Sequence, residues 1–140
     1  MSDTLTEADI ADLEQFSFGD GPELADELLA LVLAGTKTAT CWSARDGQVT
    51  EVGRRWVARD GQERPRAVLE TVALSRRRFS DVDAAFAAKE GEGDRTLAWW
   101  RDAHQRYFTR NGGFDPTMDL WCEEFRLVAT IANSVESGLA

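Results

Sequence analysis

The segment Gly35-Thr36-Lys37-Thr38-Ala39-Thr40 guides the interpretation of the whole sequence, and it contains one of the two lysines among 140 residues. It follows the apolar stretch 24–34 and precedes β-branched sequence, so we expect a helix that ends at Gly35 and a strand that begins at about Lys37. A lysine and a threonine three residues apart beyond a helix can converge on one small polar group. The glycine that a Walker loop places five residues before Gly-Lys-Ser/Thr is missing, which excludes a nucleoside triphosphate loop.

The composition is typical of one soluble globular domain, with 43% hydrophobic and 29% charged residues. The longest apolar run, residues 28–34, is far shorter than the roughly 20 residues that cross a bilayer. The N-terminus has no basic region of the kind that opens a secretory signal, so we expect a cytoplasmic protein without a membrane partner. Cys41 and Cys122 lie far apart with a single histidine available. This pattern disfavours a zinc site and favours free thiols in a reducing cytosol.

The net charge of −9 limits the possible partners. Proteins that bind long nucleic acids usually carry a basic surface, because neutralised phosphates release counterions. Here the arginines form only short clusters, at 54–55, 64–66 and 76–78. We therefore expect no DNA partner, and a small ligand or a single nucleotide in a pocket fits the charge better than a long strand.

Hydrophobic periodicity and capping residues predict an α+β protein with a mostly antiparallel sheet or small barrel. Asp60-Gly61 is a turn signal between two alternating stretches, which favours a hairpin at this point. Pro22 suits the first turn of a helix and Gly35 its end. The expected helices cover about 6–15, 22–34, 80–89 and 95–110, and the expected strands 37–42, 54–59, 67–74 with a continuation over 76–79, and 125–131.

A second polar segment, Glu90-Gly91-Glu92-Gly93-Asp94, alternates three carboxylates with two glycines between two expected helices. It can be a solvated acidic turn with Asp94 capping the next helix, a general acid or base, or a site for a hard cation. His104 falls on the apolar face of its helix, which favours a hydrogen-bonded core histidine over a catalytic one. The five tryptophans are mostly expected in the core, although one or two can stack on a base.

These segments together resemble stand-alone ASCH-domain proteins, whose signature is Gly-x-Lys-x-x-Thr after a helix. The resemblance rests on three runs and spans roughly Phe16 to Val128: Phe18-Gly19-Asp20 through Thr40, Phe86-Ala87 through Leu97 with Trp100 and His104, and Cys122-Glu123-Glu124-Phe125-Arg126. The first motif alone is weakly specific. Its combination with Glu-Gly-Glu-Gly-Asp at this distance is strongly specific.

The resemblance implies a PUA-like fold, a small mostly antiparallel β-barrel flanked by helices. One ASCH domain would then cover 1–140, with a core of about 16–132 and an N-terminal helix of about 6–15. Family members are regarded as RNA-related, and the activities attributed to them include hydrolysis of acetylated cytidine and cleavage of RNA. The amidohydrolase branch uses a lysine, a threonine and a glutamate, which match Lys37, Thr40 and Glu90. Around them we expect substrate contacts from Gly35, Thr38, Trp42, Glu92, Asp94 and Arg95.

The first hypothesis is therefore a hydrolase that acts on an acylated cytidine or on RNA, with a nucleoside or RNA as partner and no cofactor. Thr40 would be the nucleophile, and Lys37 the base, which requires that its pKa fall by about 2 to 3 units from roughly 10.4. A nearby carboxylate such as Glu90 would raise the pKa of Lys37 instead. Glu92 is the alternative acid.

Two other functions remain open. In a metal-dependent ribonuclease, Glu90, Glu92 and Asp94 would hold Mg²⁺ or Mn²⁺ while Lys37 contacts a phosphate. In a non-catalytic RNA- or nucleotide-binding module, the same cleft would bind without turnover. Two departures from the family affect the substrate more than the fold. Trp42 stands where many members have a basic residue, and the segment 45–52 is short.

Overall fold

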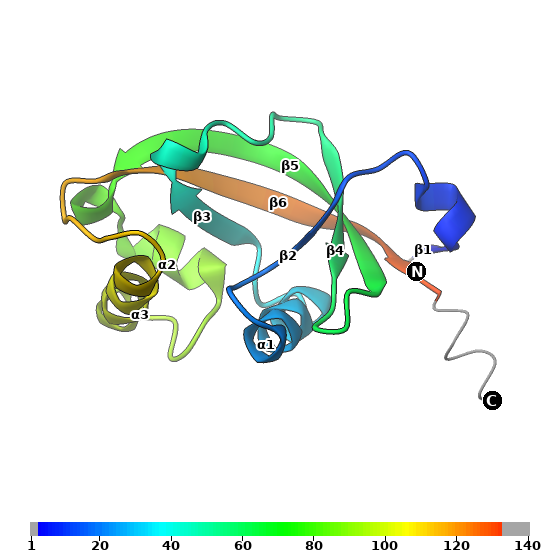
Figure 1. The fold of residues 1–140 in the computed structure, drawn as a ribbon, viewed down its shortest axis with the longest axis horizontal. Helices are drawn as coiled ribbons and strands as arrows, with labels where there is room; N and C mark the ends of the chain where they lie inside the picture. The colour runs from blue at the N-terminus through cyan, green and yellow to red at the C-terminus, as the bar shows by residue number, and fades with distance from the viewer. Residues whose placement is uncertain (1–2, 133–140) are drawn as a thin grey trace.

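The computed structural model describes residues 3–132, which form one mixed sheet of six strands with three α-helices (Figure 1). The strands are β1 (Asp3–Leu5), β2 (Gln15–Ser17), β3 (Ala39–Ser43), β4 (Arg55–Arg59), β5 (Pro65–Arg78) and β6 (Asp119–Ile131). The helices are α1 (Pro22–Leu33), α2 (Ala84–Glu90) and α3 (Leu97–Arg110), and there are 3-10 turns at η1 (Glu7–Ile10), η2 (Ala44–Asp46) and η3 (Phe79–Asp81). The predicted α+β class is confirmed.

The long antiparallel pair β5–β6 is the centre of the sheet, whose order is β1-β6-β5-β4-β2. Strand β3 pairs antiparallel with the first half of β6, while β1 pairs parallel with its last residues. Strand β2 adds a parallel edge to β4. The sheet is curved but open, because within residues 3–132 its end strands β1 and β2 do not pair with each other (Figure 1).

Helix α1 forms as its sequence predicts. Pro22 occupies the first turn, where its missing N–H costs no hydrogen bond, and Gly35 follows the last turn with φ +81°. The apolar face of α1 packs on β4 and β5, with Leu28, Leu29 and Val32 buried. No helix in the described part of the chain has both the length and the apolar character to span a membrane.

Helices α2 and α3 cover the other end of the sheet, where β3 and the start of β6 lie (Figure 1). The predicted helix over 80–89 begins later than expected, because the Asp83 carboxylate accepts the backbone N–H of Phe86 and sets the start of α2. In the same way the Thr96 hydroxyl accepts the backbone N–H of Trp99 at the start of α3. The rings of Trp100 and Phe79, whose centroids are 5.1 Å apart, pack between these helices and the sheet.

The structure corrects the N-terminal helix expected over 6–15. Thr6 and Asp9 form the predicted capping box, but it starts only the 3-10 turn η1. The chain then extends, and Gln15, Phe16 and Ser17 become β2 on the edge of β4. Pairing with an open strand satisfies backbone groups that a short surface helix would leave to water, so the sheet determines the conformation here.

Candidate active site

Two turns that are distant in sequence meet at the site. The first joins α1 to β3 and carries Lys37, and the second follows α2 and carries Glu92. The backbone N–H of Thr38 donates to the carbonyl of Lys89 at 2.8 Å. Gly91 has φ +73°, and a Cβ there would collide with the carbonyl oxygen of Thr36. The two turns therefore touch backbone to backbone, which only glycine permits at this position.

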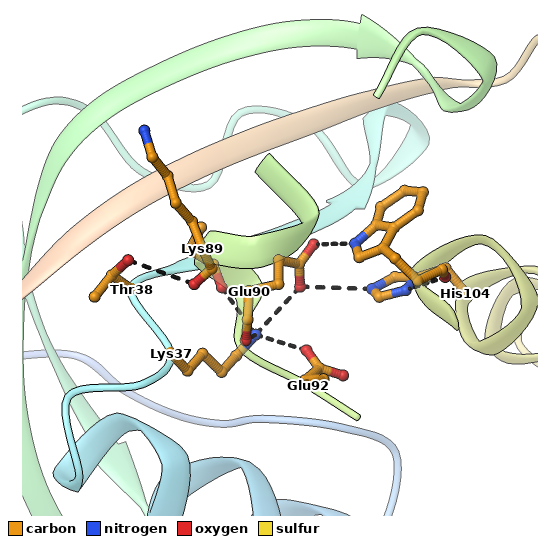
Figure 2. A network of polar contacts seen from close by, with 8 residues as sticks. Lys37, Thr38, Lys89, Glu90, Glu92 and His104 are labelled. Atoms are coloured by element: carbon orange, nitrogen blue, oxygen red, sulfur yellow. Dashed lines mark hydrogen bonds and ion pairs between the residues drawn. The ribbon is translucent and has the colours of Figure 1, made fainter. Parts of the chain in front are cut away.

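Lys37 lies at the centre of this contact and is only 2% exposed. Its ammonium donates to the carbonyl of Ala39 at 2.8 Å, to Glu92 Oε2 at 2.8 Å and to Glu90 Oε1 at 3.2 Å (Figure 2). The carbonyl of Glu90 is a fourth, longer contact at 3.5 Å, so the acceptors around the ammonium outnumber its three donors. Lys37 is thus a fully bonded buried cation between two carboxylates.

Glu90, the last residue of α2, is 1% exposed and has further partners. The indole N–H of Trp100 donates to its Oε2 at 2.8 Å. Nε2 of His104 lies 3.5 Å from its Oε1 (Figure 2). The other ring nitrogen of His104, Nδ1, lies 2.8 Å from the carbonyl of Trp100, which can only accept. Nδ1 therefore carries a proton, and Nε2 faces the carboxylate.

These contacts determine the ionisation of the central pair. Burial lowers the pKa of Lys37, but the carboxylates of Glu90 and Glu92 raise it by more, and the net pKa is raised. Burial raises the pKa of Glu90, but Lys37 and then His104 outweigh it, so that pKa lies well below its usual range. The resting site therefore contains an ammonium beside a carboxylate. The depressed pKa that a lysine base requires is not present in this state.

Glu92 and His104 complete a group of four side chains whose charges balance. Burial raises the pKa of Glu92 more than Lys37 lowers it, which makes Glu92 the carboxylate that takes up a proton most readily. Burial lowers the pKa of His104, but Glu90 raises it by more, so protonation is favoured. With His104 protonated, two cations face two anions. We call Lys37, Glu90, Glu92 and His104 the charged cluster.

A cleft with two lobes opens beside the charged cluster. The charged lobe has a volume of about 270 Å³ and is lined by the cluster together with Thr40 and Trp99. The aromatic lobe has a volume of about 240 Å³, and its lining includes Phe16, Trp42, Trp56, Tyr107, Glu123 and Phe125. Phe18, Gly19, Thr40, Cys41 and Tyr107 line both lobes. The two lobes are therefore neighbouring parts of one cleft, and Thr40 lies at their junction.

The lining of the aromatic lobe includes a carboxylate that sequence reasoning missed. Glu123 on β6 lies directly opposite Thr40 on β3. Its Oε2 accepts the hydroxyl of Thr71 at 2.6 Å. Burial raises the pKa of Glu123, although the Thr71 hydrogen bond opposes this shift. The strand expected over 125–131 begins earlier, at Asp119, so Glu123 lay outside it, and its place in the run Cys122-Glu123-Glu124-Phe125-Arg126 was the available signal.

The structure separates the predicted site residues into two groups. Lys37, Thr40, Glu90 and Glu92 line the charged lobe, and Trp42 lines the aromatic lobe. The other four predicted substrate contacts lie outside the linings of both lobes: Gly35, Thr38, Asp94 and Arg95. All four have exposed side chains or backbone. His104, which the sequence favoured as a core residue, contacts Glu90 at the wall of the cleft.

The carboxylates expected to share a metal ion do not assemble around one point. Asp94 is exposed, and its Oδ1 accepts the hydroxyl and backbone N–H of Thr96 at 2.6 and 2.9 Å. The ammonium of Lys37 lies between Glu90 and Glu92, where it would repel a divalent cation.

A different set, Cys41, Glu90 and His104, places three potential metal-ligand atoms within 4.8 Å of one another. The same ammonium of Lys37 donates to the Glu90 carboxylate, a member of this set. Burial raises the pKa of the Cys41 thiol well above its usual range, so the thiolate needed for a metal is disfavoured. Cys41 and Cys122 are free thiols on paired strands, as the sequence predicted.

Comparison with known proteins identifies the family. The ASCH domain model matches residues 14–129. An ASCH domain from Lactobacillus crispatus JV V101 has a similar crystal structure, with a TM-score of 0.77, 30% identity, and coverage of 83% of this chain and 79% of that chain. Protein EF3133 from Enterococcus faecalis V583 is similar at a TM-score of 0.77 and 30% identity, with coverage of 91% of this chain and 81% of that chain. None of the curated proteins matches the sequence. The chain belongs to the ASCH domain family and has the PUA-like α+β fold expected for it, with a sheet that stays open where a small barrel was expected.

Proposed function

We propose that this protein hydrolyses the amide of an N-acylated pyrimidine nucleoside, either free or within RNA. The observation that carries the proposal is the position of Thr40. This residue lies at the junction of a lobe lined by ionised groups and a lobe lined by aromatic rings. A nucleobase bound in the aromatic lobe would direct an attached acyl group toward Thr40 and the charged cluster.

Thr40 is the proposed nucleophile. Within residues 3–132, its hydroxyl has no hydrogen-bond partner, and Thr40 lines both lobes, so the hydroxyl is available to a ligand in the cleft. Attack by Oγ1 on the acyl carbon would form an ester with Thr40 and release the amine of the base. Water would then hydrolyse the ester and restore the hydroxyl. Such two-step acyl transfer requires a group that accepts the hydroxyl proton.

Lys37 and Glu92 together can accept that proton. Lys37 is an ammonium at rest, so it can take the Thr40 proton only as it passes one of its own to a carboxylate. Glu92 accepts a Lys37 hydrogen bond at 2.8 Å and has a raised pKa, which makes it the suitable acceptor. The proton shift leaves Lys37 charged and Glu92 neutral. The reverse shift delivers the proton to the leaving nitrogen, so the step balances.

Glu90 would act by positioning the ammonium. Its carboxylate contacts Lys37, Trp100 and His104 at once and is almost inaccessible to a ligand. These fixed contacts hold Lys37 in place with no reorganisation during the reaction, which is how enzymes gain electrostatic stabilisation. This role replaces proton donation by Glu90, since its strongly lowered pKa opposes protonation.

The test is incubation with a panel of N-acylated nucleosides and short acylated RNAs, followed by mass spectrometry of the base and of the protein. We expect loss of the acyl group, and an acyl adduct on Thr40 at early times. Thr40→Val should abolish turnover, whereas Thr40→Ser keeps a hydroxyl and should retain part of it. Lys37→Met should also abolish turnover, and Lys89→Met, which changes the second lysine on the surface, should not.

The alternatives give different results in the same assay. A metal-dependent ribonuclease would cleave unmodified RNA and lose activity with a chelator. A binding module would retain the nucleoside without turnover. Full turnover by both Thr40→Val and Lys37→Met would refute the proposed hydrolase.

A further inference from the structure

A chain of hydrogen bonds runs beneath the aromatic lobe and ends at Glu123. The indole N–H of Trp56 donates to Thr50 Oγ1 at 2.8 Å. The hydroxyls of Thr50 and Thr71 are 2.8 Å apart, and Thr71 donates to Glu123 Oε2 at 2.6 Å. Thr50 and Thr71 are 4% and 1% exposed, so the chain is buried.

The chemistry of its members fixes the direction of this chain. An indole N–H can only donate, and an ionised carboxylate can only accept. Since the single proton of Thr71 is directed to Glu123, the proton of Thr50 must be directed to Thr71. Every link therefore donates toward Glu123, and polarisation along such a chain strengthens each bond. The chain orients the carboxylate and favours its role as an acceptor.

The other carboxylate oxygen, Oε1, has no hydrogen-bond donor among the described residues. Glu123 lines the aromatic lobe together with Trp42 and Tyr107. A carboxylate in the lining of an aromatic cavity attracts a flat ring that carries an N–H group at its edge. The lobe is smaller than the roughly 300–1,000 Å³ typical of drug-sized ligands, and at about 240 Å³ it suits one ring system.

We propose that the aromatic lobe is the base-binding subsite and that Glu123 is its specificity-determining residue, accepting the exocyclic N–H of a cytosine-type base. The inference rests on the proposed function for the pyrimidine class of its ligand. Asp and Glu are the side chains that accept from the cytosine amino group when proteins read this base. The O4 acceptor of uracil would instead face the carboxylate and be repelled.

The cross-strand pairing of Thr40 with Glu123 connects recognition to the reaction. Directly opposed residues on antiparallel strands have Cβ atoms about 4.5–5.5 Å apart and point to the same face. An amide nitrogen whose N–H donates to Glu123 would therefore lie on the same face of the sheet as Thr40 Oγ1. This geometry brings the adjoining acyl carbon toward the nucleophile, and it selects a secondary amide over a tertiary one.

Binding of nucleosides that the protein cannot hydrolyse tests the inference separately from turnover. Isothermal titration with cytidine, uridine and N4,N4-dimethylcytidine compares rings that differ in the N–H donor. We expect the wild-type protein to bind cytidine roughly 10- to 100-fold more tightly than the other two, because loss of a hydrogen bond to a charged group has about this effect.

Two variants and one control locate the source of this preference. Glu123→Gln should reduce the ratio of cytidine to uridine affinity to within about threefold of one, since its amide can turn either a donor or an acceptor toward the base. Thr71→Val, which cuts the chain, should reduce the ratio in the same direction. Glu124→Gln changes the neighbouring carboxylate, which pairs with Lys89 on the surface, and should leave the ratio unchanged.

An unchanged ratio in Glu123→Gln, or an equal change in Glu124→Gln, would overturn the inference, as would the absence of nucleoside binding by the wild-type protein. Circular dichroism confirms that each variant is folded. Selective cytidine binding without turnover of any acylated nucleoside would refute the hydrolase and leave the subsite standing. Turnover of an acylated nucleoside without a Glu123-dependent preference would support the hydrolase and refute the subsite.

Discussion

The two lobes of the cleft hold carboxylates in opposite ways. In the charged lobe, Glu90 is surrounded by an ammonium, an imidazole and an indole, which direct their donors to it. In the aromatic lobe, Glu123 has one neutral hydroxyl partner, and its other oxygen has no hydrogen-bond donor among the described residues. The first arrangement fixes charge and resists change. The second leaves an acceptor for a ligand. In the proposed function, the first lobe supplies the electrostatics of the reaction and the second supplies recognition.

The largest expected effect comes from the charged lobe. Lys37→Met would leave Glu90 and Glu92 buried without their cation, and breaking a buried pair in this way costs roughly 3–5 kcal/mol of unfolding free energy. In Glu123→Gln the amide oxygen can still accept from Thr71, so the loss should be below about 1 kcal/mol. Urea unfolding at pH 7 measures both values. Equal losses in the two variants would remove the contrast between the lobes.

A double-mutant cycle sharpens this prediction. Glu90→Gln alone weakens the partner of Lys37, whereas Lys37→Met with Glu90→Gln removes the cation and one anion together. The double variant should lose clearly less free energy than the sum of the two single losses, because contacting charges are not additive. Additive losses would mean that the pair does not act as a unit.

A smaller effect is expected where the two turns touch. Gly91→Ala introduces a methyl group against the carbonyl oxygen of Thr36 at a positive φ. Gly35→Ala also occurs at a positive φ, but its Cβ would meet open space. We expect a loss of about 1 kcal/mol for Gly35→Ala from the backbone alone, and about 3 kcal/mol for Gly91→Ala, where overpacking adds to it. Thermal unfolding compares the two, and similar losses would show that the turns can separate freely.

The smallest effect concerns pH. His104 is the single histidine of the chain, so its imidazole proton resonance is assigned without ambiguity. Its raised pKa should appear as an NMR midpoint above the usual value of about 6.5, and Glu90→Gln should lower that midpoint. A pKa raised by folding contributes stability that is complete below about pH 6.5 and is lost as the pH rises through the folded-state pKa. Stability that increases over this range would contradict the proposed charge balance.

Local sequence signals were sufficient to predict the ends of helix α1 and the position of a hairpin turn. Pro22 and Gly35 bracketed α1, and Asp60-Gly61 located the hairpin between β4 and β5, which the antiparallel pairing confirms. The edge strand β2 could not be found in this way. It has three residues, and its conformation depends on the exposed edge of β4 rather than on its own sequence.

In the site too, some features follow from local sequence and others depend on strand pairing. The resemblance located Lys37, Thr40, Glu90 and Glu92, because motif spacing survives in a linear sequence. The chain from Trp56 to Glu123 depends on the register of three strands, including an irregularity in β5 between Thr71 and Ala73 that alters the pairing with β6. A one-residue change of register reverses the face of every side chain, and spacing alone does not determine it.

The meeting of the two turns at Gly91 also has a consequence for synthesis of the protein. Lys37 and Glu90 are 53 residues apart in sequence, so the lysine leaves the ribosome well before its counter-ions are made. Until α2 arrives and settles on the earlier turn, enclosing this cation would leave it without an anion, which is costly. The ion pair thus disfavours closure of the pocket before Glu90 and Glu92 are available. We therefore expect burial of Lys37 to follow synthesis of the second half of the chain.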